Sequence, residues 1–221
     1  MNTKISQLQL DYEENYHTQR HSQHVDPEYY EARAQIALTK FFRGIDTNSR
    51  ILDYGCGMGQ NIALLPNAMG YDISEYSVGF AKQKGINATN DLENIPEESF
   101  DYIFSSHVLE HHPYPKTMIE SMRSKLKTGH DLLLIIPHER HGRGSFELDL
   151  NQHLYTWNFQ TINNLLISSG FKIKENKYLR GAGYNRLLPL NKINHKLYYH
   201  ITNLISRLAG IKEIMVVATK K

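Results

Sequence analysis

A glycine-rich stretch, residues 51–61, constrains the fold of this chain more than any other feature. It reads ILDYGCGMGQN, so a short apolar strand runs directly into a turn in which Gly55, Gly57 and Gly59 alternate with other residues. Glycine is required where the backbone takes a positive φ, or where a ligand must approach the main chain closely. We predict that the turn opens a helix at residues 61–65, whose free amides would attract an electronegative group.

Two acidic residues accompany this turn. Asp53 lies two residues before the first glycine, and Asp72 ends the next predicted strand. In doubly wound α/β proteins an acidic side chain at the end of the second strand binds the hydroxyl groups of a ribose. A glycine turn alone also occurs as a purely structural feature, but the turn together with Asp72 indicates a site for a ribose-containing cofactor.

The rest of the chain alternates between short apolar runs and segments with apolar residues at helical spacing. Strands are predicted at 51–54, 68–73, 86–89, 100–105, 131–136, 171–178 and 214–219, and helices at 28–42, 75–84, 115–126, 159–168 and 194–208. This alternation predicts an α/β fold with a doubly wound, mostly parallel seven-stranded sheet. No crossover helix packs on the sheet before the last strand, so we expect that strand to run antiparallel.

The glycine motif also carries a resemblance. Leu52-Asp53-x-Gly55-x-Gly57-x-Gly59 resembles the first motif of the class I S-adenosylmethionine-dependent methyltransferases, and the order of elements is similar over residues 30–180. A nicotinamide- or flavin-binding protein would carry G-x-G-x-x-G, whereas position 60 is Gln. A cofactor-binding protein without catalysis remains an alternative on the same fold.

The resemblance implies a set of cofactor contacts. The glycine turn would lie beside the methionine part of S-adenosylmethionine, Asp72 would bind both ribose hydroxyls, and S-adenosylhomocysteine would be the product. Ile73 would border the adenine, and Asp91 and Leu92 would hold its edge. The implied cofactor-binding residues are Asp53, Gly55, Cys56, Gly57, Gly59, Asn61, Asp72, Ile73, Asp91, Leu92 and Ser106.

Histidines are concentrated in three segments, 105–113, 137–141 and 149–157. On the predicted fold all three lie at the carboxyl edge of the sheet, where open α/β proteins bind ligands. Methyl transfer to a hydroxyl group is assisted by a base, and histidine suits this role near neutral pH. The candidate bases are His107, His111 and His153.

Two interpretations of the histidines remain open. One resembles the metal-assisted ubiquinone-pathway O-methyltransferases and small-RNA 2′-O-methyltransferases, which carry acid-x-x-Glu-His after the fourth strand and a further histidine downstream. The divalent ion would then be held by His107, Glu110, His111 and His153, with His107 in place of the acid. Imidazole ligands would suit Zn, Mn, Fe or Co better than Mg. In the other interpretation, Leu109-Glu110-His111 is the common family signature and no metal is bound.

Charge is distributed unevenly along the chain. Residues 1–171 contain 14 Lys+Arg and 21 Asp+Glu, a net charge of −7, whereas residues 172–221 contain 11 and two, a net charge of +9. The basic part is either a solvated surface, or a surface that meets a phosphate-bearing substrate or a membrane.

The basic part includes an insert at residues 179–212. Gly181, Gly183 and Pro189 predict a loop, followed by an amphipathic helix. Its apolar stripe consists of Leu197, Ile201, Leu204, Ile205 and Leu208. Such a stripe either packs against the domain, or serves as a substrate lid or a contact with a membrane surface.

Composition sets the remaining expectations. No apolar run is long enough to span a bilayer, the N-terminal stretch of residues 1–20 has no apolar segment of signal-peptide length, and Cys56 is the only cysteine. We therefore expect a single cytoplasmic domain, peripheral at a membrane if the insert binds one. It would comprise an N-terminal cap (1–27), a cofactor-binding core (28–178), the insert (179–212) and a last strand (213–221).

The predicted function is O-methylation of a small-molecule or saccharide acceptor, including phosphate-bearing and lipid-linked ones. RNA 2′-O-methylation is the alternative suggested by the Glu-His pattern. It is less favoured, because the core is acidic and no long basic run interleaved with aromatic residues occurs.

Overall fold

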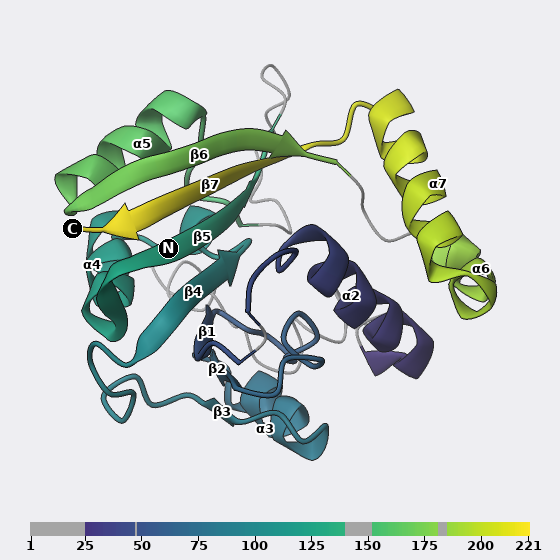
Figure 1. The fold of residues 1–221 in the computed structure, drawn as a ribbon, viewed down its shortest axis with the longest axis horizontal. Coiled ribbons are helices and arrows are strands. Elements are labelled where there is room, and N and C mark those ends of the chain that lie inside the picture. Colours follow the sequence, from purple (N-terminus) through teal and green to yellow (C-terminus); the bar gives the residue numbers. More distant parts are fainter. Residues whose placement is uncertain (1–24, 47, 140–151, 181–184) are drawn as a thin grey trace, which may run out of the picture.

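The computed structural model describes residues 25–46, 48–139, 152–180 and 185–221. They form a twisted seven-stranded sheet in the order β3-β2-β1-β4-β5-β7-β6 (Figure 1). The strands are β1 (Ile51–Tyr54), β2 (Ala68–Tyr71), β3 (Ala88–Thr89), β4 (Phe100–Ser106), β5 (Leu126–Pro137), β6 (Phe171–Leu179) and β7 (Glu213–Lys220). The pairs among β1–β5 are parallel, and β7 is antiparallel to both β5 and β6. The predicted α/β fold with an antiparallel last strand is confirmed.

Separate hydrophobic cores cover the two faces of the sheet. In β5, Leu132 and Leu134 belong to the core that includes residues of α4 (Pro115–Lys125) and α5 (Phe159–Ser168), whereas Leu133 packs with the core at the end of α2 (Pro27–Lys40). Alternate side chains of a strand point to opposite faces. This explains why β5 reads as a continuous apolar run, since both its faces are buried.

The prediction of a helix at residues 61–65, after the glycine turn, is wrong. Residues 60–64 form turns, and only residues 55–67 connect β1 to β2. A crossover between parallel strands normally takes a dozen or more residues, usually with a helix. The glycine turn occupies residues 55–59 of this connection, so too few residues remain for a helix and the segments that would join it to the strands.

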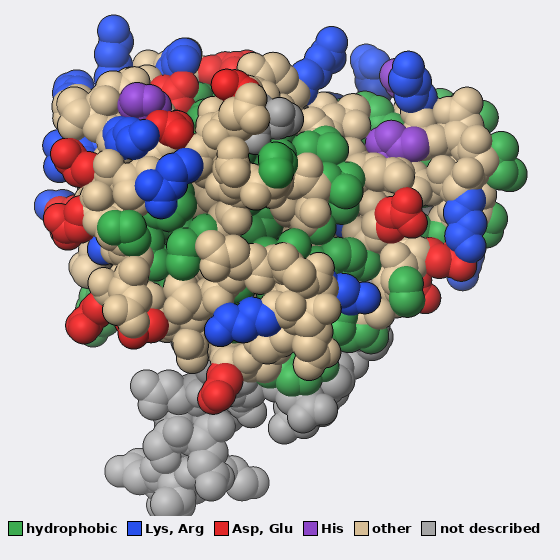
Figure 2. Space-filling model, turned by 60° about the horizontal axis from the view of Figure 1, so that its bottom comes forward, with side chains coloured by type: hydrophobic (Ala, Val, Ile, Leu, Met, Phe, Trp, Pro, Cys, Tyr) green, Lys and Arg blue, Asp and Glu red, His purple; other side chains and the backbone are tan. Residues whose placement is uncertain are grey.

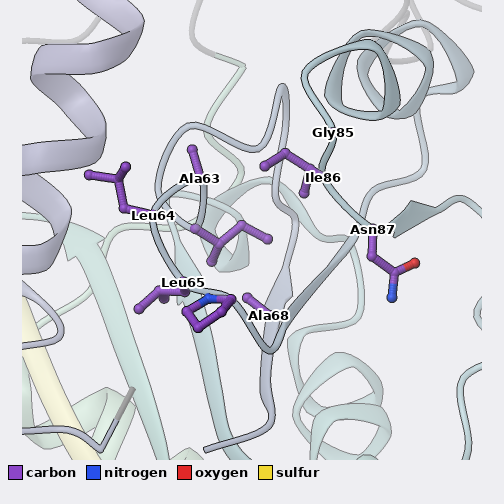
Figure 3. Close-up of a pocket in the computed structure, with 9 residues that line it drawn as sticks. Ala63, Leu64, Leu65, Ala68, Gly85, Ile86 and Asn87 are labelled. Carbon is purple, nitrogen blue, oxygen red and sulfur yellow. The ribbon is translucent and has the colours of Figure 1, made fainter. Parts of the chain in front are cut away.

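The short connection leaves a hollow of about 390 Å³ (Figure 3). Its lining comes from residues 62–66, from Ala68 at the start of β2, and from residues 85–87 before β3. These are the amino ends of the two strands. The hollow therefore lies at the edge of the sheet away from Asp72, which follows the carboxyl end of β2.

The insert between β6 and β7 contains more helix than predicted. Residues 188–193 form α6 (Leu188–Ile193), preceded by the 3₁₀ turn η3 (Asn185–Leu187). Pro189 lies in the first turn of α6, where proline is tolerated because the amide it lacks would have no partner in the helix. The predicted loop is thus partly wrong, and Gly181 and Gly183 lie outside the described residues.

The predicted amphipathic helix is confirmed as α7 (His195–Leu208), with the Asn194 side chain accepting the Leu197 amide at its amino end. It packs on α2 and α6 at one end of the molecule (Figure 1). The helix buries Tyr198. Of the predicted stripe, Leu197, Leu204 and Leu208 are exposed and Ile201 and Ile205 are half-buried, so the stripe packs against the domain only in part. The predicted N-terminal cap, apart from residues 25–27, lies outside the described part of the chain.

Candidate active site

The glycine turn follows β1 at the carboxyl edge of the sheet. A Cβ atom on Gly55 would lie 2.2 Å from Cγ2 of Val108, so only glycine lets the segment after β4 approach the end of β1 so closely. Gly57 has φ 52°, and no heavy atom of the described residues lies within 4 Å of where its Cβ would be. One side of the turn is therefore packed against the segment that carries the histidines, and the other side has open space.

Two carboxylates with different surroundings flank this turn. Asp53 is fully buried, and neither of its oxygens has a hydrogen-bond partner among the described residues. Burial, and secondly the charge of Asp72, raise the pKa of Asp53 well above its usual range. The Asp72 carboxylate accepts hydrogen bonds from the amides of Gly57 (2.7 Å) and Ser74 (3.0 Å). A buried carboxylate without a partner is costly, so Asp53 is suited to bind a cationic group.

The residues after the turn add further buried acceptors. The side-chain oxygens of Gln60 and Asn61 are buried and have no hydrogen-bond partner in the described part of the chain. Cys56 differs, because its amide bonds to Tyr71, its carbonyl accepts the Gly59 amide, and its thiol bonds to the Gly57 carbonyl. Cys56 thus shapes the turn with all of its polar groups.

The other predicted cofactor residues lie after the next strands. Ile73, directly after Asp72, is exposed. Leu92 packs against the hydrophobic core that includes residues of α4 and α5. Asp91 accepts the Glu93 amide (3.0 Å) and so holds its own turn. Ser106 is the last residue of β4. All four lie at or after the carboxyl ends of β2, β3 or β4.

Glu110 lies at the centre of the histidine cluster. Its side chain is fully buried on the 3₁₀ turn η2 (Leu109–His111). Its Oε1 atom lies 3.5 Å from Nδ1 of His107. The same oxygen lies 3.9 Å from Nε2 of His111 and 4.0 Å from Nε2 of His153. The structure therefore brings together all four residues that the sequence marks as candidates.

His107 is held by two carboxylates. Its Nε2 atom lies 3.0 Å from Oε1 of Glu213, the first residue of β7, and Glu213 also pairs with Lys40 of α2. Desolvation lowers the pKa of His107, but the neighbouring carboxylates of Glu110 and Glu213 outweigh this effect and raise the pKa to about 9. His107 is therefore a cation at neutral pH, which suits a fixed charge and not a base.

Glu213 and Lys40 were not predicted as functional residues. The available signal was that Glu213 is one of only two acids among residues 172–221. Burial raises the pKa of Glu213, but the hydrogen bond from His107 and the charge of Lys40 outweigh it and lower the pKa to about 2. Glu213 thus stays ionised and fixes His107.

His111 and His153 are arranged differently. Their rings meet edge to face, with centroids 4.8 Å apart. Burial lowers the pKa of His111, so its imidazole is neutral near pH 7. Nδ1 of His153 is hydrogen-bonded to Oε1 of Glu139, which follows β5 and was also missed as a functional residue. That bond leaves Nε2 of His153 directed toward Glu110.

Three of the residues meet the spacing of a metal site. One ligand atom each from Glu110, His111 and His153 lie within 4.8 Å of one another. Zinc binds imidazole nitrogens and carboxylate oxygens at roughly 2.0–2.2 Å, so a small inward movement would complete such a site. His107, the fourth predicted ligand, is not part of this group, because both of its nitrogens face carboxylates.

The comparison with protein families decides the class. A family model described as a methyltransferase domain matches residues 21–176. The chain belongs to this methyltransferase family. The match covers the glycine turn, Asp72 and the whole of the histidine cluster except Glu213, and it makes the protein an S-adenosylmethionine-dependent methyltransferase of class I. No curated protein matches the chain significantly.

Solved structures share the fold at low sequence identity. A possible histamine N-methyltransferase from Thermotoga maritima is 15% identical, with TM-score 0.61 over 94% of this chain and 99% of that one. The magnesium protoporphyrin IX methyltransferase from Synechocystis, with bound S-adenosylmethionine, is 18% identical, with TM-score 0.56 over 88% and 80%. A phosphoethanolamine N-methyltransferase from Haemonchus contortus is 15% identical, with TM-score 0.58 over 93% and 59%. These acceptors differ, so the shared fold leaves the acceptor of this methyltransferase open.

Proposed function

We propose that this methyltransferase transfers a methyl group to a hydroxyl oxygen of a small-molecule or saccharide acceptor. The observation that carries the proposal is the His153–Glu139 pair, which lies beside the neutral His111 at the carboxyl edge of the sheet. An amine acceptor that is already neutral needs no base, whereas a hydroxyl group benefits from one.

The glycine turn and its neighbours would hold S-adenosylmethionine. The buried Asp53 carboxylate fits the α-ammonium group of the methionine part, because that group would supply the missing hydrogen bonds. Asp72 is proposed for the ribose hydroxyls, and Ile73, Asp91 and Leu92 for the adenine. Ser106, Asn61 and the backbone at Gly55, Cys56, Gly57 and Gly59 would complete the contacts.

The chain's own residues account for the rest of the reaction. When bound, S-adenosylmethionine supplies an electrophilic methyl group. His153 would take the hydroxyl proton on Nε2, while Nδ1 donates to Glu139 and the carboxylate stabilises the resulting imidazolium. The His107 cation keeps Glu110 ionised, and Val108 against Gly55 holds the segment 107–111 next to the glycine turn.

A metal-assisted version rests on the spacing of Glu110, His111 and His153. In this version the three residues would hold a divalent ion, which would supply a positive charge beside the acceptor, and Zn, Mn, Fe or Co would suit the imidazoles. His107 would act as a fourth ligand only after leaving Glu213. The RNA 2′-O-methyltransferase alternative would share this site.

The basic insert supports an acceptor that carries phosphate or a lipid-linked phosphate. Residues 179–212 contain six Lys+Arg and no acid. We propose that the core, residues 28–178, binds the cofactor, and that the insert, residues 179–212, borders the acceptor site before the last strand, residues 213–221. The proposed location is the cytoplasm.

The proposal is tested by changing His153 to Gln and assaying methyl transfer to a panel of hydroxyl acceptors. General-base catalysis contributes roughly 10²–10⁴-fold, so kcat should fall by about that factor while S-adenosylmethionine binding by calorimetry is unchanged. His130→Gln is the matched control, since this exposed histidine contacts Asp101 away from the cluster. A His153→Gln enzyme with wild-type kcat on every accepted hydroxyl would refute the role of the base.

A further inference from the structure

Helix α7 leaves the leucines of its apolar stripe exposed. The face that packs inward carries Tyr198, Thr202 and Ser206, which are all buried. On the opposite side Leu204 is 57% exposed and Leu208 is 80% exposed. Solvent exposure of an ordered row of leucines is unfavourable, at about 25 cal/mol per Å² of apolar surface. No described residue covers these leucines.

The exposed apolar surface extends beyond one helix. Ile193, at the end of α6, is 82% exposed, and Leu197 and Ile211 are exposed as well. On the face seen in Figure 2, hydrophobic and basic side chains, with acidic ones among them, lie at the end of the molecule formed by α6 and α7. We use the name α7 surface for the exposed apolar residues on α7 and beside its two ends, namely Ile193, Leu197, Leu204, Leu208 and Ile211.

Cationic side chains follow one edge of the α7 surface. At 3.6 residues per turn, Lys196, His200 and Arg207 lie on the same flank of the stripe. Neither Lys196 nor Arg207 forms an ion pair with any residue that the structure describes. The surrounding insert has no acidic residue to balance them. An occupant must therefore offer apolar groups and negative charge side by side.

We propose that the α7 surface docks on a membrane that contains anionic lipids, with the helix lying in the plane of the interface. An interfacial helix buries its apolar face at the acyl boundary while lysine and arginine reach the phosphates. A second copy of this chain fits less well, because stacking two such surfaces would bring Lys196 and Arg207 of each copy together without acidic partners from either insert. In the described part of the chain no helix has the length and apolar character to cross a bilayer, so the contact is peripheral.

The α7 surface is joined closely to the candidate site. Ile211 belongs to the surface, and Glu213, two residues later, contacts His107. Docking would therefore place the segment of residues 211–213, which contacts the histidine cluster through Glu213, near the lipid surface. The inference goes beyond the proposed reaction and does not depend on it, because membrane binding is measured without turnover.

The experiment is flotation of the full chain with vesicles of pure phosphatidylcholine and with vesicles in which phosphatidylglycerol replaces part of it. The wild type should float with the anionic vesicles only. Lys196→Gln with Arg207→Gln should lower the partition coefficient roughly 30-fold, from about 1 kcal/mol for each cation. Leu204→Gln with Leu208→Gln should lower it on the order of 100-fold, from the loss of two buried leucines.

Matched controls come from the opposite end of the sheet. Ile167 on α5 is 52% exposed, and Lys116 on α4 is also exposed, so Ile167→Gln with Lys116→Gln changes similar side chains elsewhere. This control should float like the wild type, and circular dichroism melting shows that each variant is folded. The proposal is overturned by a wild type that does not float, or by stripe variants that float as it does. A wild-type dimer that the leucine changes convert to monomer would also overturn it, in favour of self-association.

Discussion

Replacing Asp53 with Asn should stabilise the protein without cofactor and weaken cofactor binding at the same time. Asp53 is fully buried without a hydrogen-bond partner among the described residues, and burial raises its pKa. Leaving a buried polar group unsatisfied costs about 1–3 kcal/mol, and more for a charge. The Asn amide would still lack partners, so only the extra cost of the charge is removed. The free energy of unfolding should therefore rise by about 1 kcal/mol, which corresponds to a Tm increase of roughly 2–4 °C for a chain of this size.

The cofactor should respond in the opposite direction. A hydrogen bond to a charged group contributes about 1.5–3 kcal/mol, so S-adenosylmethionine should bind Asp53→Asn roughly 10- to 150-fold more weakly. Differential scanning fluorimetry and isothermal titration calorimetry measure the two effects. Asp131→Asn is the control, because Asp131 pairs with Lys174 and Thr219 on the sheet and should leave affinity unchanged. An Asp53→Asn protein with a lower Tm and unchanged affinity would refute the reasoning.

The remaining predictions concern the charges around the histidines. The pKa of His107 is raised to about 9, so the stability that its ion pair contributes is complete below about pH 6.5 and is lost as the pH rises from 6.5 to 9. The pKa of Glu213 is lowered to about 2, so the stability that its ionised form contributes is present above about pH 4.5 and is lost as the pH falls toward 2. The wild-type Tm should therefore decline on both sides of pH 4.5–6.5. Glu213→Gln should flatten this profile, and a variant profile parallel to that of the wild type would contradict the pairing. If Glu110, His111 and His153 hold an ion, purified protein should contain about one divalent metal per chain by elemental analysis, and His111→Ala should lose it. Purified protein that contains no metal and whose turnover is insensitive to chelators would exclude the metal-assisted version and leave the version in which His153 acts as a base.

Much of the fold could be predicted from local sequence. The run at residues 131–136 indicates a strand buried on both faces, and β5 is such a strand. The lack of a crossover helix on the sheet before the last strand predicted the antiparallel β7. The prediction of a helix at residues 61–65 was wrong, because the local pattern does not show that residues 55–67 are too few to hold both the glycine turn and a helix. The sequence left the burial of the α7 stripe open, because periodicity locates an apolar face without showing which way that face points.

The candidate site could be predicted only in part. The glycine turn, Asp72 and the Glu110-His111 pair are local patterns, and their meeting at one sheet edge follows from the order of parallel strands. Glu213 lies 106 residues from His107, and the two meet because β7 aligns Glu213 with Pro137 at the end of β5. Such a register depends on the packing of the whole sheet, so no local sequence pattern predicts it.

The most direct test of the account is calorimetric titration of the purified chain with S-adenosylmethionine and, separately, with NADH. The account predicts saturable binding of S-adenosylmethionine at one site per chain and none of NADH. Asp72→Ala should weaken the former by about 1–3 kcal/mol, because two hydroxyl hydrogen bonds are lost. Absence of S-adenosylmethionine binding, or tight binding of NADH in its place, would contradict the central claim.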